Sequence, residues 1–487
     1  MLRRHVAPTL VVGLDCASPE LVFDRFATEM PFLESIRASG TWGPLRSTDP
    51  PITVPAWACM TSGRDPGELG LYGFRNRIPS SYGWRMAEAR DVRVKSVFDH
   101  LSNAGRRVAS LFVPLTHPAP PLRGCSISGF LTPERSNAWT FPRRLSSELT
   151  ARHGSYRADL IEFRGVAFPE ACRNLHAMAD QHFSIAHELF SEFTPDLMMM
   201  VEIGPDRLHH CGYHLFDPES RSYSEEHEAL ARDYYRALDR HIEQLAGNYP
   251  SNASIIIVSD HGAQAMRGGI CINDWLCEHG YLFLNRGLSK SPQRLGVEDI
   301  DWSKTKAFGE GGYYARICLN IEGREPKGII PASRFELVRD RLAKELSSWC
   351  MSEGLSAPLI TRPEQHYRTA RGFPPDLMVY FEDLAFRSLG TVGHPKLIAS
   401  ENDLAPDGCN HAWNGIGILN DNATRYPTQG ELREGMHLYD ITPTLLSLQS
   451  IEPPKGILGS DLSALPSTDS DAPISEPSGG LHSNVHW

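Results

Sequence analysis

Residues 254–262 read SIIIVSDHG, and this short stretch decides the fold. Its run of three isoleucines and a valine is typical of a buried strand. Asp260 and His261 follow at the carboxyl end of that strand, where ligands gather in an open α/β sheet. Adjacent side chains of a regular strand face opposite ways, so both can reach one metal ion only where the strand gives way to the turn at Gly262.

Strand and helix patterns alternate on both sides of this stretch. Apolar strand runs are predicted at 9–14, 108–113, 197–203 and 415–419, and helices at 97–104, 181–193, 222–247, 334–347 and from 440 onward. Alternation of this kind is the signature of an α/β sheet with helices on its faces. We therefore expect a doubly wound, mostly parallel sheet with helices on both faces and inserted lid segments.

Two long stretches interrupt the alternation. We expect a core built from residues 1–117, 181–275 and 406–465, an insertion or cap at 118–180, and a second insertion or lid at 276–405. The segment EGGYY at 310–314 could face a substrate, although a glycine-rich turn between strands is the commoner explanation. The tail, 466–487, lacks apolar periodicity and is predicted to be disordered.

The composition is that of an acidic globular protein. Among 487 residues, 48 basic and 59 acidic side chains leave a formal charge of −11, which repels nucleic-acid polymers. No apolar run approaches the ~20 residues that span a bilayer, so we expect no membrane partner. The ten cysteines form no CxxC zinc pair and are interpreted as reduced thiols. The basic start has no cleavage site before Asp15, which favours a cytoplasmic protein.

Further polar residues stand at or near the ends of predicted strands. Asp15 ends the first strand, where a turn or helix-capping acid is the ordinary interpretation. Thr53 precedes a helix pattern. A threonine there is ordinarily an N-cap, but the same geometry aims its hydroxyl at free N–H groups that stabilise anions.

Histidines supply the rest of the candidates. Asp206 and His210 are four apart, so on a helix they share one face and can share a cation, although a surface hydrogen bond is the commoner reason for this spacing. His209 and His214 are competing ligands. His411 stands just before the strand at 415–419 and, taken singly, is more typical of a structural residue.

Together these motifs provide three aspartates, three histidines and a hydroxyl, each at or near a strand end. Carboxylate and imidazole in that number suit Zn²⁺ or a similar first-row ion, with enough ligands for two ions. The joint arrangement is far less expected by chance than any of its parts.

In order and spacing these motifs resemble the alkaline phosphatase superfamily, and more closely its type I phosphodiesterase and nucleotide pyrophosphatase branch, including bacterial phosphohydrolases and phosphomutases. The resemblance rests on the strand-end residues above and on TVPAWACMTSG from Thr53. It implies an alkaline phosphatase-like fold with two divalent metal ions. It also implies two ligand sets: Asp15, Asp260 and His261 with the Thr53 oxygen, and Asp206, His210 and His411.

The resemblance implies a hydrolase that cleaves a phosphodiester or phosphoanhydride in a small nucleotide-like or phosphonate-containing substrate. A metal-bound hydroxyl has a lowered pKa, so Thr53 could attack phosphorus and form a covalent phosphothreonine. Two metal ions clamp such an in-line displacement. Zinc is the expected metal, and the same ligands accept manganese.

Two departures from the family pattern concern specificity. Many nucleotide pyrophosphatases have an asparagine three residues after the nucleophile, and here that position is Ala56. Asn76 is a candidate replacement that would contact the substrate, although an asparagine in a loop usually serves the turn. The CxPxR segment of sulfatases is missing, which makes a sulfatase the weakest interpretation.

Two other functions stay open. A phosphomutase or phosphotransferase would use the same Thr53 and would need the lid to hold the dephosphorylated product. A catalytically silent metal-binding protein is the second alternative, and the full set of ligands argues against it.

Overall fold

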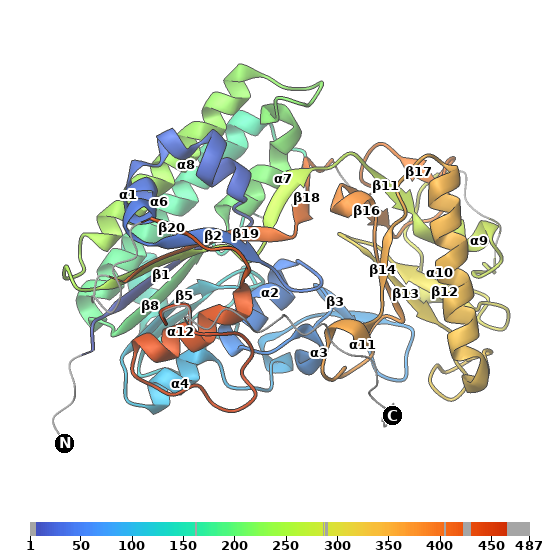
Figure 1. The fold of residues 1–487 in the computed structure, drawn as a ribbon, viewed down its shortest axis with the longest axis horizontal. Coiled ribbons are helices and arrows are strands. Elements are labelled where there is room, and N and C mark those ends of the chain that lie inside the picture. Colours follow the sequence, from blue (N-terminus) through green and yellow to red (C-terminus); the bar gives the residue numbers. More distant parts are fainter. Residues whose placement is uncertain are drawn as a thin grey trace.

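The computed structural model describes residues 6–160, 163–285, 287, 291–403, 406–421 and 430–464. In this part of the chain, a mixed, mostly parallel sheet of ten strands forms the larger of two lobes (Figure 1). Its strands, in order across the sheet, are β20 (Glu431–Leu432), β2 (Thr41–Arg46), β19 (Asn414–Asp421), β9 (Ser254–Val258), β1 (Thr9–Leu14), β8 (Leu197–Glu202), β5 (Val108–Val113), β6 (Gly124–Ser128) and β7 (Thr140–Phe141), with β21 (Met436–His437) beside β2.

Five parallel strands form the centre of this sheet. Strand β1 lies between β9 and β8, and β5 and β6 continue beyond β8. Strand β19 runs antiparallel between β9 and β2. The strands predicted at 9–14 and 108–113 are confirmed at those bounds. Because β1 and β9 are parallel neighbours, the residues that follow them emerge at the same edge of the sheet.

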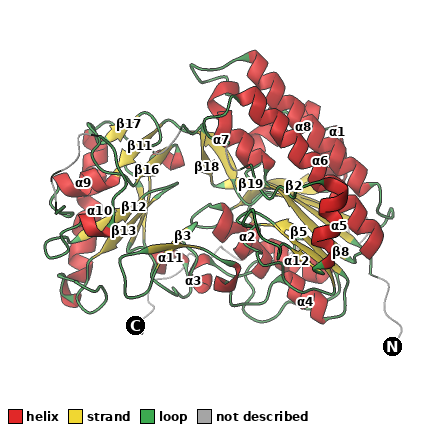
Figure 2. Ribbon diagram, turned by 180° about the vertical axis from the view of Figure 1, so that it is seen from behind, coloured by secondary structure: helices red, strands yellow, loops and turns green. Residues whose placement is uncertain are grey.

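Helices cover both faces of the sheet, as predicted (Figure 2). Leu10 and Val12 of β1 pack in one core with α1, α6, α7 and α8, whereas Val11 packs in a second core with α2, α4 and α12. Alternate residues of a strand point to opposite faces, so a strand buried along its whole length needs a helical layer on each side. The helices of this lobe are α1 (Pro31–Ser39), α2 (Thr53–Ser62), α3 (Pro66–Leu69), α4 (Val97–Asn103), α5 (Arg144–His153), α6 (Phe168–Phe193), α7 (Gly204–Phe216), α8 (Glu225–Ala246) and α12 (Ile441–Leu448).

The stretch at 118–180 differs from the expected separate insertion. Strand β6 pairs in parallel with β5, and β7 pairs antiparallel with β6, so both extend the main sheet. Helix α6 begins at Phe168 rather than near 181 and packs along α8. Strands β6 (GCSIS) and β7 (TF) are short and contain no apolar run, so the sequence carries no strand signal there.

A second lobe is built from residues that lie mostly within the expected lid. It contains the sheet β12 (Ala307–Glu310), β13 (Ala315–Leu319), β15 (Leu377–Tyr380) and β14 (Leu359–Thr361), the sheet β16 (Phe386–Leu389), β11 (Gly268–Cys271) and β17 (Ile398–Ala399), and helices α9 (Ile272–Glu278), α10 (Phe335–Ser352) and α11 (Pro363–His366). These elements share a hydrophobic core of their own. The lobe begins before residue 276, because β11 belongs to its sheet.

Two small ribbons complete the architecture: β3 (Arg75–Arg77) with β4 (Trp84–Met86), and β10 (Gly262–Ala265) with β18 (Cys409–Ala412).

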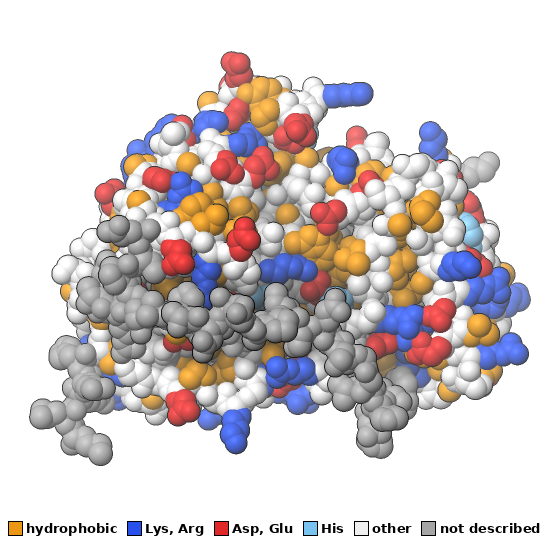
Figure 3. All heavy atoms as spheres, viewed as in Figure 1, with side chains coloured by type: hydrophobic (Ala, Val, Ile, Leu, Met, Phe, Trp, Pro, Cys, Tyr) orange, Lys and Arg blue, Asp and Glu red, His pale blue; other side chains and the backbone are white. Residues whose placement is uncertain are grey.

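All ten cysteines are free thiols. No helix in the described ranges has the length and apolarity required to cross a bilayer. On the face seen in Figure 3, basic and acidic side chains intermix. The predicted disordered tail at 466–487 lies outside the described residues.

Candidate active site

Four of the predicted residues meet where β1 and β9 end. His261 Nε2 lies 3.1 Å from Asp260 Oδ2, 3.8 Å from Asp15 Oδ1 and 3.2 Å from Thr53 Oγ1. All four side chains are buried. The backbone N–H of Cys16 donates to Asp260 Oδ1 at 3.2 Å and joins the two strand ends.

Thr53 is the first residue of α2, and the N-cap position belongs to Ile52, which has no capping side chain. The ordinary interpretation of this threonine as an N-cap is therefore wrong. Its hydroxyl points instead to His261. One turn later, Trp57 Nε1 donates to Asp15 Oδ2 at 2.7 Å, so α2 also orients the carboxylate at the end of β1.

The other predicted residues form an adjoining group. Asp206 and His210 lie on α7, as their spacing predicts, with Asp206 Oδ1 3.3 Å from His210 Nε2. His411 on β18 places Nε2 3.5 Å from the same oxygen and 3.3 Å from His210 Nε2. Both ribbon views place β18 where the larger lobe meets the second lobe (Figure 1, Figure 2).

The two groups are contiguous. The donor atoms of Asp206, His210 and His411 lie within 4.8 Å of one another, and so do those of Asp15, Asp206 and His261. The structure thus gathers all seven predicted side chains at one edge of the sheet. The competing His209 is placed elsewhere, because its Nε2 meets the Tyr235 hydroxyl at 2.9 Å.

Three buried carboxyl groups lie close together in this cluster, and Arg207 pairs with one of them, Asp206. Burial, with Asp260 and Asp206 nearby, raises the pKa of Asp15 well above its ordinary value. Burial likewise raises the pKa of Asp260, with a further contribution from Asp206. Asp15 Oδ1, Asp206 Oδ1 and Asp260 Oδ2 are buried and accept no hydrogen bond from the residues that the structure describes. Buried oxygens of this kind are costly unless a cation neutralises them.

The histidines complement these oxygens. Burial lowers the pKa of His411 to about 4 and the pKa of His261 well below its ordinary value, so both rings are neutral and carry a free lone pair. Neutral imidazole together with carboxylate is a donor set that suits zinc or manganese. The residues present therefore fit divalent metal ions.

The sequence analysis missed three residues of the site, Asp407, Arg387 and Arg164. Asp407 Oδ1 lies 2.6 Å from His210 Nδ1, and Arg387 and Arg164 bind its other oxygen at 2.5 and 2.8 Å. The only signal for Asp407 in the sequence was its position four residues before His411.

The second lobe contributes Tyr313, whose hydroxyl lies 3.2 Å from His210 Nε2 and whose ring stacks on His411 at 3.7 Å between centroids. Tyr313 falls in the EGGYY segment, for which the sequence left open a position facing the substrate but favoured a glycine-rich turn between strands.

Asn76 is engaged within its own loop. Its Oδ1 accepts from the Tyr72 N–H at 2.7 Å, and its Nδ2 donates to the Gly73 carbonyl at 3.1 Å. These contacts are the turn chemistry expected of a loop asparagine. A role of Asn76 in substrate binding stays a prediction.

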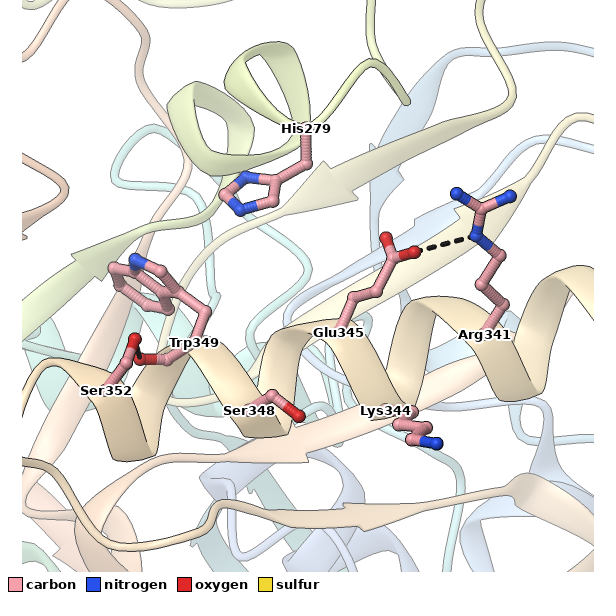
Figure 4. Close-up of a pocket in the computed structure, with 7 residues that line it drawn as sticks. All are labelled: His279, Arg341, Lys344, Glu345, Ser348, Trp349 and Ser352. Carbon is pink, nitrogen blue, oxygen red and sulfur yellow. Dashed lines mark hydrogen bonds and ion pairs between the residues drawn. The ribbon is translucent and has the colours of Figure 1, made fainter.

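A shallow hollow between α9 and α10 contains none of the predicted residues (Figure 4). Arg341 and Glu345 pair across one end of it at 2.7 Å, and His279 and Trp349 form its other walls. The chemistry predicted from the sequence therefore lies at the sheet edge and not in this hollow.

A doubly wound sheet that gathers carboxylates, imidazoles and a helix-start threonine at one edge defines an alkaline phosphatase-like hydrolase. The sequence model of the family "Type I phosphodiesterase / nucleotide pyrophosphatase" matches residues 9–399, and the chain belongs to this family. It is accordingly a hydrolase that acts on phosphoric ester bonds. No curated protein matches the chain.

Solved structures share the fold. Phosphonoacetate hydrolase from Sinorhizobium meliloti 1021, in complex with phosphonoformate, has a TM-score of 0.59 and 17% identity over 91% of this chain and 95% of that chain. Human ectonucleotide pyrophosphatase/phosphodiesterase 5 has a TM-score of 0.54 and 13% identity over 93% and 97% of the two chains. An inactive variant of the murine protein, in complex with AMP, has a TM-score of 0.54 and 12% identity with the same coverage.

Proposed function

We propose that this protein is a two-metal phosphoesterase in which Thr53 is the nucleophile. The bond cleaved would be a phosphodiester or phosphoanhydride in a small nucleotide-like or phosphonate-containing molecule. One observation carries the proposal: the Thr53 hydroxyl has no capping role and lies 3.2 Å from His261 Nε2, which also contacts the buried carboxylates of Asp15 and Asp260.

In this proposal Asp15, Asp260 and His261 hold one ion with the Thr53 oxygen. The second ion is held by Asp206, His210 and His411. Bound divalent ions lower the pKa of a coordinated hydroxyl and offset the charge of phosphoryl oxygens.

The protein's own residues orient and carry the reaction. The first turn of α2 offers free N–H groups to the phosphoryl oxygens. Thr53 Oγ1 bonds to phosphorus as the ester or anhydride oxygen leaves, and the hydroxyl proton passes to solvent. Water then hydrolyses the phosphothreonine and restores the threonine. Trp57 holds Asp15 in place throughout.

The relatives support the substrate class. The structural neighbours bind phosphonoformate and AMP, both small and phosphorus-containing, and the inactive murine variant carries a threonine-to-alanine change. We further propose that the second lobe acts as a lid, because it delivers Tyr313 to the site. The ten unpaired cysteines favour a reducing compartment such as the cytoplasm.

Hydrolysis of bis-p-nitrophenyl phosphate, p-nitrophenyl phosphate and p-nitrophenyl sulfate by the metal-loaded protein tests the proposal. We expect the diester to be preferred, and Thr53→Ala to lower turnover by at least about a thousandfold while retaining metal and fold. A chelator should abolish turnover, and zinc or manganese should restore it.

Thr61→Ala is the matched control, because Thr61 lies on the same helix and bonds only to carbonyls of that helix among the described residues. Its turnover should stay at the wild-type level. Wild-type rates in Thr53→Ala would remove Thr53 as the nucleophile. Silence on all three substrates with two metals bound would favour a mutase or transferase.

A further inference from the structure

A second group of metal-ligating side chains lies in the second lobe. Cys271 ends β11, Asp274 lies in the first turn of α9, and His394 lies in the segment that leads to β17 (Figure 1). The Cys271 sulfur, an Asp274 oxygen and a His394 nitrogen all lie within 4.8 Å of one another. None of these residues belongs to the Thr53 site.

Asp274 links the start of α9 to residues 393 and 394 by hydrogen bonds. Its Oδ1 accepts from the Gly393 N–H at 2.8 Å, and its Oδ2 accepts from the His394 N–H at 3.2 Å. An ionised carboxylate offers about four lone-pair sites, so oxygen donors remain after these two bonds. The carboxylate is thus held in place with capacity to bind a cation.

The contacts of His394 define which ring nitrogen is free. Because a carboxylate only accepts hydrogen bonds, the Thr391 hydroxyl donates its proton to Asp403 Oδ2 at 2.8 Å. The Thr391 hydroxyl oxygen must then accept a hydrogen bond from His394 Nε2 at 2.7 Å. The proton therefore sits on Nε2, and Nδ1 carries the lone pair. Histidines that bind metals are commonly oriented by such a hydrogen bond from their other nitrogen.

The burial of these three side chains and the local charge also favour a bound cation. Cys271 and Asp274 are fully or almost fully buried, and His394 is half-buried. The buried Asp274 carboxylate beside the Cys271 sulfur creates an electronegative position that a divalent cation would neutralise.

We propose that Cys271, Asp274 and His394 bind a divalent transition-metal ion of the zinc class, separate from the ions of the Thr53 site. Donor atoms around a tetrahedral zinc ion lie roughly 3.5 Å apart, so a small closure of these side chains completes the geometry and leaves the fourth position to water. The ion replaces the thiol proton, which is released to solvent. It ties the start of α9 to residues 391–394 and thereby stabilises the second lobe.

Cobalt substitution of the full-length protein tests this site, because a thiolate bound to Co²⁺ gives a charge-transfer band in the near ultraviolet and oxygen or nitrogen ligands do not. We expect the band in the wild type and its loss in Cys271→Ser. Cys277→Ser, on the neighbouring helix α9, is the matched control and should retain it. Elemental analysis should show about one zinc ion fewer per chain in Cys271→Ser.

His394→Gln provides a second variant at a half-buried position, should Cys271→Ser misfold as judged by circular dichroism. It should also lose the bound ion. A wild type without the band, or a band that persists in Cys271→Ser, would overturn the proposal. Thr53→Ala should keep the band, and Cys271→Ser should keep diester turnover, so this proposal and the proposed function fail separately.

Discussion

The buried carboxylate of Asp407 orients His210 by binding the ring nitrogen that faces away from Asp206 and His411. Burial alone would raise its pKa, but Arg387 and His210 hold it far below its ordinary value, so the carboxylate stays charged. Burial would lower the pKa of His210, and Asp407 instead raises it well above its ordinary value. His210 Nδ1 donates to Asp407 Oδ1, and Nε2 is the nitrogen that faces Asp206 and His411.

Replacing Asp407 by asparagine should weaken metal binding to the Asp206, His210 and His411 set by about 10–100-fold, the usual cost of losing a partner of a ligand. The neutral amide no longer fixes the proton on Nδ1. Competition with a chromophoric chelator measures the affinity. Asp383→Asn is the control, because Asp383 is exposed and bonds to Trp413. Equal affinities in Asp407→Asn and the wild type would contradict the assignment.

At the scale of elements, the connection between β12 and β13 brings a phenol of the second lobe into the site. Arg387 lies 4.4 Å from the centre of the Tyr313 ring, and Asn410 Nδ2 donates to the Tyr313 carbonyl at 3.2 Å. Tyr313 is therefore held from both sides beside His210 and His411. A substrate phosphoryl group in this position would meet its hydroxyl.

Tyr313→Phe should lower kcat/KM by about 10–100-fold, because a hydrogen bond to a charged group contributes roughly 1.5–3 kcal/mol. Bound metal should be unchanged. Tyr314→Phe is the matched control: its hydroxyl donates to the Tyr72 carbonyl at 2.7 Å and serves packing. Wild-type kcat/KM in Tyr313→Phe would show that the phenol does not touch the substrate.

At the scale of the whole molecule, the buried carboxylates link metal binding to stability. In the metal-free protein the pKa values of Asp15 and Asp260 lie above the unfolded value of 3.8. Between the unfolded and folded values the folded state binds more protons than the unfolded state. The contribution of these two carboxyl groups to the stability of the metal-free chain therefore falls as the pH rises through this window.

Zinc should consequently raise the melting temperature more at about pH 8 than at about pH 5. The ion removes the repulsion between the buried carboxylates, and its ligands must be deprotonated to bind it. At a hundredfold excess over Kd the stabilisation is about 3 kcal/mol. Scanning calorimetry with and without zinc measures both shifts. Asp260→Asn should reduce the difference between them. A larger shift in acid would refute this linkage.

Local patterns in the sequence were enough to predict the sheet and the candidate site residues at its edge. A buried strand appears as an apolar run, and the residue after it must emerge at the carboxyl edge of a parallel sheet. That is why Asp15, Asp260 and His261 were found beside strands that pair as β1 and β9. The four-residue spacing of Asp206 and His210 was read in the same way from the helix period.

Only the tertiary structure decided which distant residues complete the site and the fold. Asp407 is 197 residues from His210 and Tyr313 is 103 residues from it, and no local period connects such pairs. The strands within 118–180 were missed for another reason: β6 and β7 are short and contain no apolar run, and they become strands by pairing at the edge of the main sheet. Contacts between residues far apart in the chain depend on how the packed layers meet, and that geometry is absent from any short stretch of sequence.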